Sequence, residues 1–407
     1  MVSNQVEWIA RSEAQLRRNR TGASLAFGAQ GLMFAVLLTH VPQFKDRYSI
    51  GDNGIALVIL AVSLLAGAGS VSAETLARRW SSRITLQAAL LWIGLAALLI
   101  AAAGGSRPVF LLAFVVYGFG LGAVDAGTNM QAVAVQTRYG RVILTSFHAW
   151  WSAGGIVGAL YVAGTERAGL ALGWSIAIPA ALVVLLAATS SALLLRADHG
   201  QGSGPLTRRL PWRPVLLLGA AMICFYVVDA GAGTWATTYA KDDLGASAAL
   251  APVAYAAYQA TALVSRVLGD RTVRRFGVQP TVRVAAVVGV AGLVLAICAP
   301  GPWLAIVGFG VVGIGLPVVA PLCFSACGIL APGHADQVVA RVNVFNYLGS
   351  IIGGVAIGAI GGVGTLRWGF LVPAVLAAGL LWLAPAFEPD PLTAADPLTE
   401  ADAAGRA

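Results

Sequence analysis

Long apolar segments, separated by short polar stretches, occupy almost the whole chain. Most are about 20 residues long and none alternates strictly between apolar and polar positions, so they predict helices that cross a bilayer rather than strands. Pro317 and Pro321 predict a kink in the tenth segment, because proline removes a backbone donor. The twelve segments lie at residues 22–42, 53–73, 84–103, 108–135, 143–164, 170–195, 214–240, 248–269, 281–299, 302–329, 338–364 and 367–386.

Composition agrees with this pattern. Of the 407 residues, 58% are hydrophobic and only 11% are charged, and the mean hydropathy is +0.80. Soluble domains carry about 25% charged residues, so the chain is expected to be an all-α membrane protein. The 49 glycines suit close helix packing in lipid.

The 26 Lys and Arg residues are divided unequally between the two sides that this pattern defines. With the N-terminus placed in the cytoplasm, twenty lie on the inner side and six on the outer side. This positive-inside bias predicts cytoplasmic termini and a multi-pass protein of the plasma (inner) membrane. We therefore interpret the net charge of +8 as a result of membrane topology rather than as a sign of nucleic-acid binding. The outer set is Lys45, Arg47, Arg107, Arg167, Lys241 and Arg367.

The longest polar interruption divides the segments into six and six. Residues 21–195 and 214–386 are the two expected halves, joined by a cytoplasmic linker at 196–213 that contains Gly200–Pro205. Residues 1–20 form a basic cytoplasmic tail, and residues 387–407 an acidic cytoplasmic tail that we expect to be disordered.

The two halves repeat each other. Glu74-Thr-Leu-Ala-Arg78-Arg79-Trp80 matches Asp270-Arg-Thr-Val-Arg274-Arg275-Phe276 at an offset of 196, each just after the second segment of its half. The fifth segments also match, at an offset of 198, with Phe147 and Ser152 meeting Phe345 and Ser350, and with His148 meeting Asn346. Two agreeing offsets indicate duplication of a six-helix unit. In transporters with parallel repeats, the halves rock around a central site.

These features resemble the major facilitator superfamily, through the twelve segments in two repeated halves and Arg266-Val-Leu-Gly-Asp270-Arg271-x-x-Arg274-Arg275-Phe-Gly277. Two further stretches, Asp125-Ala-Gly-Thr-Asn129-Met-Gln and Ser146-Phe-His148-Ala-Trp-Trp-Ser152, are similar to a bacterial branch that includes rhizopine transporters and lies near the fucose permeases. The resemblance covers about residues 20–386 and implies two pseudo-symmetric six-helix halves. The first half departs from the superfamily pattern, with Ser70 and Glu74 at its Gly and Asp positions.

Two carboxylates lie inside apolar segments, Asp125 in the first half and Asp229 in the second. An ionisable group at membrane depth costs about 2.5–3.5 kcal/mol on insertion scales, so each is a candidate for proton coupling. The resemblance also implies an acid near Asp229. His148 is the third proton-coupling candidate. The alternative is a structural role, with each group paired to a neighbouring helix.

Amide, phenol and hydroxyl groups form stripes on the inward faces of several segments and suit a sugar, polyol or cyclitol. Hydrogen bonding between helices is the alternative role for them. The substrate-binding candidates are Gln30, Asn129, Ser152, Tyr255, Gln259, Asn343 and Asn346.

The repeated acidic and basic motifs lie at the cytoplasmic edge. There, Asp270 can pair with arginines or meet a helix N-terminus of the other half, which would hold that side shut. The gating candidates are Glu74, Arg78, Arg79, Asp270, Arg271, Arg274 and Arg275.

Together these observations predict a secondary active transporter that works by alternating access, with proton-coupled symport of a small hydroxylated solute. Drug/proton antiport is the alternative, although the fifth segment, Trp151-Ser-Ala-Gly154-Gly155, lacks the proline of the usual antiporter pattern. A non-transporting sensor on a transporter fold is a further alternative.

No enzyme is expected, because the four His are scattered and no nucleophile motif appears. No phosphate-binding loop appears, so we expect a proton gradient rather than ATP to drive transport, without cofactors. Cys323 and Cys327 lack further ligands for a metal. The expected partners are a small-molecule substrate and the bilayer, not nucleic acid, with the monomer as functional unit.

Overall fold

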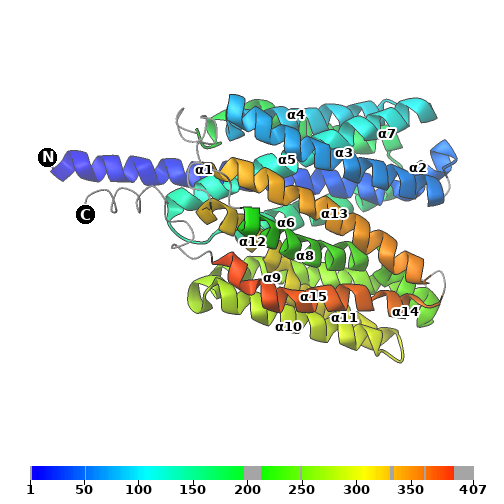
Figure 1. Cartoon of the computed structure of the whole chain (residues 1–407). Coiled ribbons are helices and arrows are strands. Elements are labelled where there is room, and N and C mark those ends of the chain that lie inside the picture. The colour runs from blue at the N-terminus through cyan, green and yellow to red at the C-terminus, as the bar shows by residue number, and fades with distance from the viewer. Residues whose placement is uncertain are drawn as a thin grey trace.

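The computed structural model describes residues 2–50, 52–196, 212–247, 250–330, 334–361 and 364–388. Most of the expected linker and most of the expected acidic tail therefore lie outside the described residues. The described part is helical throughout, as predicted, and the helices run roughly parallel between two ends of one bundle (Figure 1). We call the end where the N-terminus and the last described residues lie the terminal end, and the other the opposite end.

The N-terminal half consists of seven α-helices and a short 3-10 turn. The residues of the expected basic tail belong to the same continuous helix as the first expected segment. The elements are α1 (Val2–Thr39), α2 (Val41–Tyr48), α3 (Asp52–Arg79), α4 (Ser82–Ala101), α5 (Arg107–Tyr139), α6 (Leu144–Arg167), α7 (Leu172–Thr189) and η1 (Ser190–Ala192).

The C-terminal half repeats the order of the long helices of the N-terminal half. Its tenth-segment helix is interrupted at Pro317 by a 3-10 turn, so the predicted kink is confirmed. The elements are α8 (Trp212–Thr238), η2 (Tyr239–Asp243), α9 (Ala251–Phe276), α10 (Val278–Ile297), α11 (Pro302–Gly315), η3 (Leu316–Val318), α12 (Val319–Leu330), α13 (Ala335–Gly361), α14 (Leu366–Gly369), α15 (Leu371–Leu383) and η4 (Ala384–Phe387).

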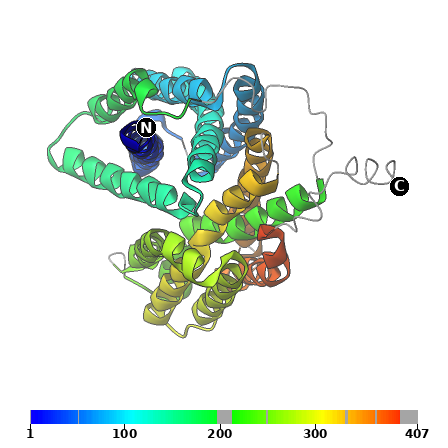
Figure 2. The same ribbon diagram turned by 90° about the vertical axis from the view of Figure 1, so that its left-hand side faces the viewer.

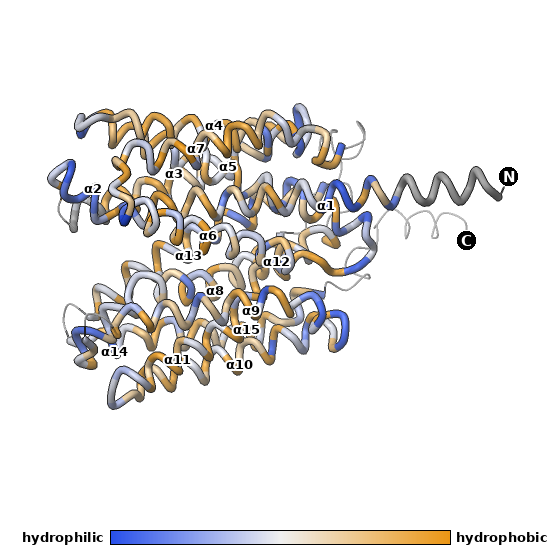
Figure 3. Tube along the Cα trace, turned by 180° about the vertical axis from the view of Figure 1, so that it is seen from behind, coloured by the Kyte–Doolittle hydropathy of each residue, from blue (hydrophilic) through white to orange (hydrophobic). Residues whose placement is uncertain are grey.

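Ten of the described helices are long and apolar enough to cross a membrane. α6 and α9, which correspond to the expected fifth and eighth segments, are more polar but reach 24 and 26 residues and lie in the same bundle. Hydrophobic residues extend along the helices, whereas hydrophilic residues gather near the two ends (Figure 3). The repeated motifs lie in the last turns of α3 and α9, except for Trp80, which follows the end of α3. Only Trp80–Ser81 and Gly277 separate these helices from the next ones.

Glycines set the helix crossings inside each half. α1 packs on α6 and α8 packs on α13, the pairing that a duplicated unit requires. A Cβ at Gly154 would lie 2.0 Å from the carbonyl oxygen of Gly28, and one at Gly353 would lie 2.5 Å from that of Val227. Both crossings therefore bring backbone against backbone, which is how helices associate closely in lipid.

The halves meet most extensively where α3 packs on α13 and α6 packs on α9, and α5 also contacts α12 and α13. The view from the terminal end shows the helices of the first half and those of the second as two groups (Figure 2). The groups that could carry function lie along this interface.

Candidate functional site

Asp125 lies midway along α5 and accepts hydrogen bonds from both halves. Gln30 Nε2 on α1 donates to its Oδ1 (3.1 Å). On α13 of the other half, Asn346 Nδ2 (3.0 Å) and Tyr347 OH (3.1 Å) donate to its Oδ2. Three neutral donors thus surround the carboxylate, and among the described residues no cation lies within 4.0 Å of it. The bonds from α13 join the halves directly.

Asn129 and His148 continue this network within the first half. Asn129 lies one helical turn after Asp125, and its Nδ2 donates to the Asp125 backbone oxygen (2.8 Å). Its Oδ1 therefore faces His148 Nε2 at 3.2 Å, an arrangement that requires the Nε2 nitrogen to donate. The imidazole lies between the rings of Phe27 and Phe324, with centroids 5.1 and 6.1 Å away. One amide thus links His148 to the backbone oxygen of Asp125, one turn along α5, rather than to its carboxylate.

Asp229 forms a second acidic position, on α8. Tyr258 OH on α9 donates to its Oδ1 at 2.5 Å. The Tyr255 ring stacks beside that of Tyr258, with centroids 6.3 Å apart. Asp229, Tyr255 and Gln259 keep partial exposure. These contacts lie within the second half, whereas Asp125 is contacted from both halves.

Arg266 was not among the substrate or coupling candidates, yet the structure places it at the interface of α6 and α9. Its Nη1 donates to Ser152 Oγ of the other half at 2.6 Å, and its Cζ lies 5.6 Å from the centroid of the Trp151 ring. The sequence did contain a signal for it. Arg266 falls within the apolar segment 248–269, one turn before Asp270, and begins the motif that carries the family resemblance.

The two motif carboxylates both cross to the other half, near the terminal end. Asp270 accepts from the backbone N–H groups of Thr145 (2.9 Å) and Ser146 (3.1 Å), in the first turn of α6. It also accepts from the Thr145 hydroxyl (2.5 Å). Of the two partners expected for Asp270, the structure therefore shows the helix N-terminus. We refer to this contact, together with the Glu74–Arg341 pair, as the cross-half latch.

Glu74 is the counterpart of Asp270 on α3. It accepts from Arg341 Nε (3.1 Å) and Nη2 (2.9 Å) on α13. Nearby, Ser70 Oγ donates to the Ala340 backbone oxygen (3.0 Å), and Asn343 Nδ2 donates to Ser70 Oγ (3.2 Å). Asn343 thus lies beside the cross-half latch, one turn from the group that contacts Asp125.

The arginines of the repeated motifs contribute unequally. Arg274 Nη1 donates to the backbone oxygen of Val142 in the other half (3.0 Å). Arg78, Arg79 and Arg271 are exposed, and Arg79 and Arg275 lie over the rings of the aromatic residues that follow them. Arg341, which was not predicted, is the residue that pairs with the acid of the first motif.

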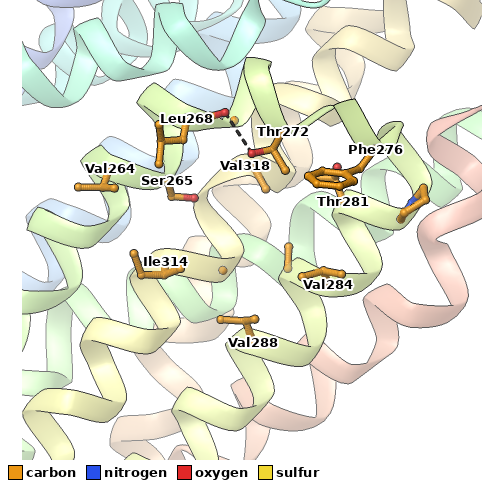
Figure 4. Close-up of a pocket in the computed structure, with 14 residues that line it drawn as sticks. Val264, Ser265, Leu268, Thr272, Phe276, Thr281, Val284, Val288, Ile314 and Val318 are labelled. Atoms are coloured by element: carbon orange, nitrogen blue, oxygen red, sulfur yellow. Dashed lines mark hydrogen bonds between the residues drawn. The ribbon is translucent and has the colours of Figure 1, made fainter. Parts of the chain in front are cut away.

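The apolar groove of Figure 4 is lined by other residues than the polar groups described above, although Phe276 in its wall contacts Arg275. It has a volume of about 470 Å³ and is lined by residues of α9, α10, α11 and η3. Leu268, Phe276 and Val284 in its wall are 51–62% exposed. On a membrane protein, such a surface faces lipid.

Comparisons with known proteins agree with this architecture. The sequence profile of the Major Facilitator Superfamily matches residues 218–406. An uncharacterised MFS-type transporter of Yersinia pestis is 28% identical over 354 residues, covering 86% of this chain and 91% of the relative. Membrane protein MosC of Rhizobium meliloti is 23% identical over 348 residues, covering 84% and 83%. Over most of its length, the chain is thus similar to transporters of the major facilitator superfamily.

Solved structures of this superfamily share the fold. The transporter FucP in its outward conformation superposes with a TM-score of 0.75 at 16% identity, covering 91% of this chain and 98% of FucP. The human organic anion transporter MFSD10 gives 0.75 at 14% identity, covering 91% and 99%. The proton:xylose symporter XylE gives 0.71 at 16% identity, covering 91% and 96%. The shared fold is that of multi-pass membrane transporters, in agreement with the resemblance seen in the sequence.

Proposed function

We propose that this chain is a secondary active transporter of the plasma (inner) membrane that couples proton entry to symport of a small hydroxylated solute. The observation that carries the proposal is Asp125, a carboxylate at membrane depth whose partners come from both halves. As an anion it accepts from Gln30, Asn346 and Tyr347. Once protonated, it becomes partly a donor and accepts less strongly, so a proton weakens the bonds from α13.

This coupling fits a rocking mechanism. The cross-half latch closes the terminal end, and within the described residues every hydrogen bond between the halves lies between that end and the level of Asp125. We place the terminal end in the cytoplasm, since it carries most of the basic residues. The structure then corresponds to an outward-facing state, with the bonds between α5 and α13 available to change upon protonation.

Polar groups near the interface support a hydroxylated solute. Tyr255, Gln259 and Asp229 are partly exposed and offer both donors and acceptors. FucP is described as a fucose:proton symporter and XylE as a proton:xylose symporter, which supports the same class of transport here. Asn129, Ser152 and Asn346 bond to other side chains in this state, so they would reach a solute only by exchanging those partners.

The test measures the pH outside lightly buffered, de-energised cells as inositols, amino-inositols, deoxy-sugars and then cationic drugs are added. Symport removes protons from the medium, so we expect alkalinisation with at least one hydroxylated solute. Asp125→Asn should abolish this signal while the protein remains inserted, because an amide cannot carry the proton. Asp46→Asn is the matched control, since Asp46 is an exposed carboxylate on α2.

Alkalinisation that persists in Asp125→Asn would remove Asp125 from the coupling scheme. Proton movement driven only by cationic drugs in energised vesicles would instead favour drug/proton antiport. Solute binding without flux would favour the sensor alternative.

A further inference from the structure

Arg266 is the only Lys or Arg among the described residues that is buried, with 6% of its surface exposed. It lies on the inward face of α9, two turns after Tyr258 and one turn before Asp270, and so between the second acidic position and the cross-half latch. A charge in such a position is costly unless a partner of opposite charge compensates it.

Within the described part of the chain, no such partner is present. No carboxylate lies within 4.0 Å of the Arg266 nitrogens. Nη1 donates to the neutral Ser152 hydroxyl, whereas the buried Nε has no hydrogen-bond partner. Asp229 accepts instead from Tyr258, and Asp125 from three neutral groups. The guanidinium thus keeps an unsatisfied donor.

We propose that Arg266 binds a carboxylate of the transported solute, which makes the substrate a hydroxylated acid such as a sugar acid rather than a neutral sugar. This proposal rests on the proposed symport function and specifies its substrate class. The planar guanidinium presents Nε and a terminal nitrogen side by side, in the spacing that a carboxylate accepts. Trp151 covers one face of the guanidinium, and Ser152 fixes its orientation.

The single buried cation selects a monoanion over a dianion. A carboxylate on Arg266 leaves no net charge at that position, whereas a phosphate dianion would need a second cation. The same solute would extend its hydroxyl groups toward Tyr255 and Gln259, two turns or more before Arg266 on the same helix and both partly exposed. Sugar acids carry both a carboxylate and several hydroxyl groups in one small molecule.

The test uses purified protein and matched ligand pairs: D-glucose with D-glucuronate, D-galactose with D-galacturonate, and D-glucose 6-phosphate as the dianion. Ligand-dependent shifts in melting temperature in detergent give affinities without requiring transport. We expect the uronates to stabilise the wild type and the neutral sugars to do so at least about tenfold more weakly, as loss of a charged hydrogen bond implies.

The variants separate binding from folding. Arg266→Gln should remove the preference for uronates, and Arg266→Lys should retain part of it, because lysine keeps the charge but not the planar pair of donors. Arg283→Gln, which neutralises an exposed arginine on α10, is the matched control and should keep the full preference. Ser152→Ala keeps the positive charge of Arg266 but removes the hydroxyl that orients it, so it should lower uronate affinity severalfold. This variant tests the proposal if Arg266→Gln fails to fold.

Three results would overturn the proposal: equal or tighter binding of the neutral sugars, an undiminished uronate preference in Arg266→Gln, or no stabilisation by either uronate. Tighter binding of D-glucose 6-phosphate would overturn it as well, in favour of a phosphate site. Proton-coupled uptake of a neutral polyol, unaffected by Arg266→Gln, would support the proposed symport and reject only the acidic substrate. Uronate binding without proton movement would support the acidic substrate and reject proton symport.

Discussion

At the scale of single residues, the functional groups are held by neutral donors. The Asp125 carboxylate accepts a hydrogen bond from an amide of its own half, and from an amide and a phenol of the other half. The Asp229 carboxylate accepts a hydrogen bond from the phenol of Tyr258. Neither acid forms a salt bridge with a described residue, which suits the proton-coupling role proposed for both.

We expect Asp229→Asn to abolish concentrative uptake while the protein still inserts, if Asp229 carries a proton or contacts the solute. Tyr258→Phe should lower the uptake rate by a smaller factor, because it removes only the donor. Tyr161→Phe is the matched control, since the Tyr161 hydroxyl has no hydrogen-bond partner among the described residues. Uptake of labelled solute against its gradient is the measurement. Full accumulation in Asp229→Asn would show that this carboxylate is not needed for coupling.

At the scale of helices, two kinds of contact set the positions. Inside each half, glycines let backbones touch, as at the crossing of α8 and α13. Between the halves, carboxylates bind either a helix N-terminus or an arginine. The proposed mechanism requires the first kind to persist and the second to break, so that the halves move as rigid bodies while their own helices stay together.

Gly353→Ala tests the glycine packing at the crossing of α8 and α13. Its Cβ would lie 2.5–3.0 Å from backbone atoms of Val227, so α8 and α13 would have to separate. We expect a lower melting temperature in detergent and a lower yield of folded protein. The adjacent Gly354→Ala should be neutral or slightly stabilising, because a Cβ there would meet no atom of the described neighbouring residues within 4 Å and alanine favours helix. Equal stability of the two variants would contradict the assigned role of this crossing.

Asp270→Asn tests the contact between α9 and the N-terminus of α6. Loss of the negative charge there should weaken the cap by about 0.5–2 kcal/mol, the range seen for helix caps and dipoles. We expect slower turnover with little change in substrate affinity, measured as the maximal rate and KM of uptake. A large rise in KM with an unchanged maximal rate would place Asp270 in the substrate site instead.

At the scale of the whole molecule, the two halves close one end through duplicated contacts. Glu74 and Asp270 occupy matching positions of the repeat, yet one binds Arg341 and the other binds backbone N–H groups of α6. The shared feature is that each acid crosses to the fifth long helix of the other half. The interface is thus symmetric in geometry but not in chemistry.

A double-mutant cycle tests whether the Glu74–Arg341 pair acts as a unit. Glu74→Gln and Arg341→Gln should each change the rate of uptake, and the double variant should resemble the more impaired single variant, because residues in direct contact are not additive. Additive effects on the logarithm of the rate would show that the two side chains act separately. Arg283→Gln combined with Glu74→Gln supplies the additive reference.

The sequence by itself determined the helices, their order, the duplication and the positions of the acids at membrane depth. These are local properties, because a bilayer demands about 20 apolar residues per helix and penalises each charge within it. The site residues could be named from the same signal, since Asp125, Asp229 and His148 stand out against apolar neighbours. Their functional roles remain predictions.

Only the tertiary structure decided which groups meet. The sequence did not predict that Arg341 binds Glu74, that Asn346 and Tyr347 cross to Asp125, or that Arg266 lies buried against Ser152. The reason is that lipid and protein interior are equally apolar, so apolar residues cover every face of a membrane helix and its rotation cannot be read from their periodicity. Partners are set by how helices from distant parts of the chain rotate against one another, which packing alone determines.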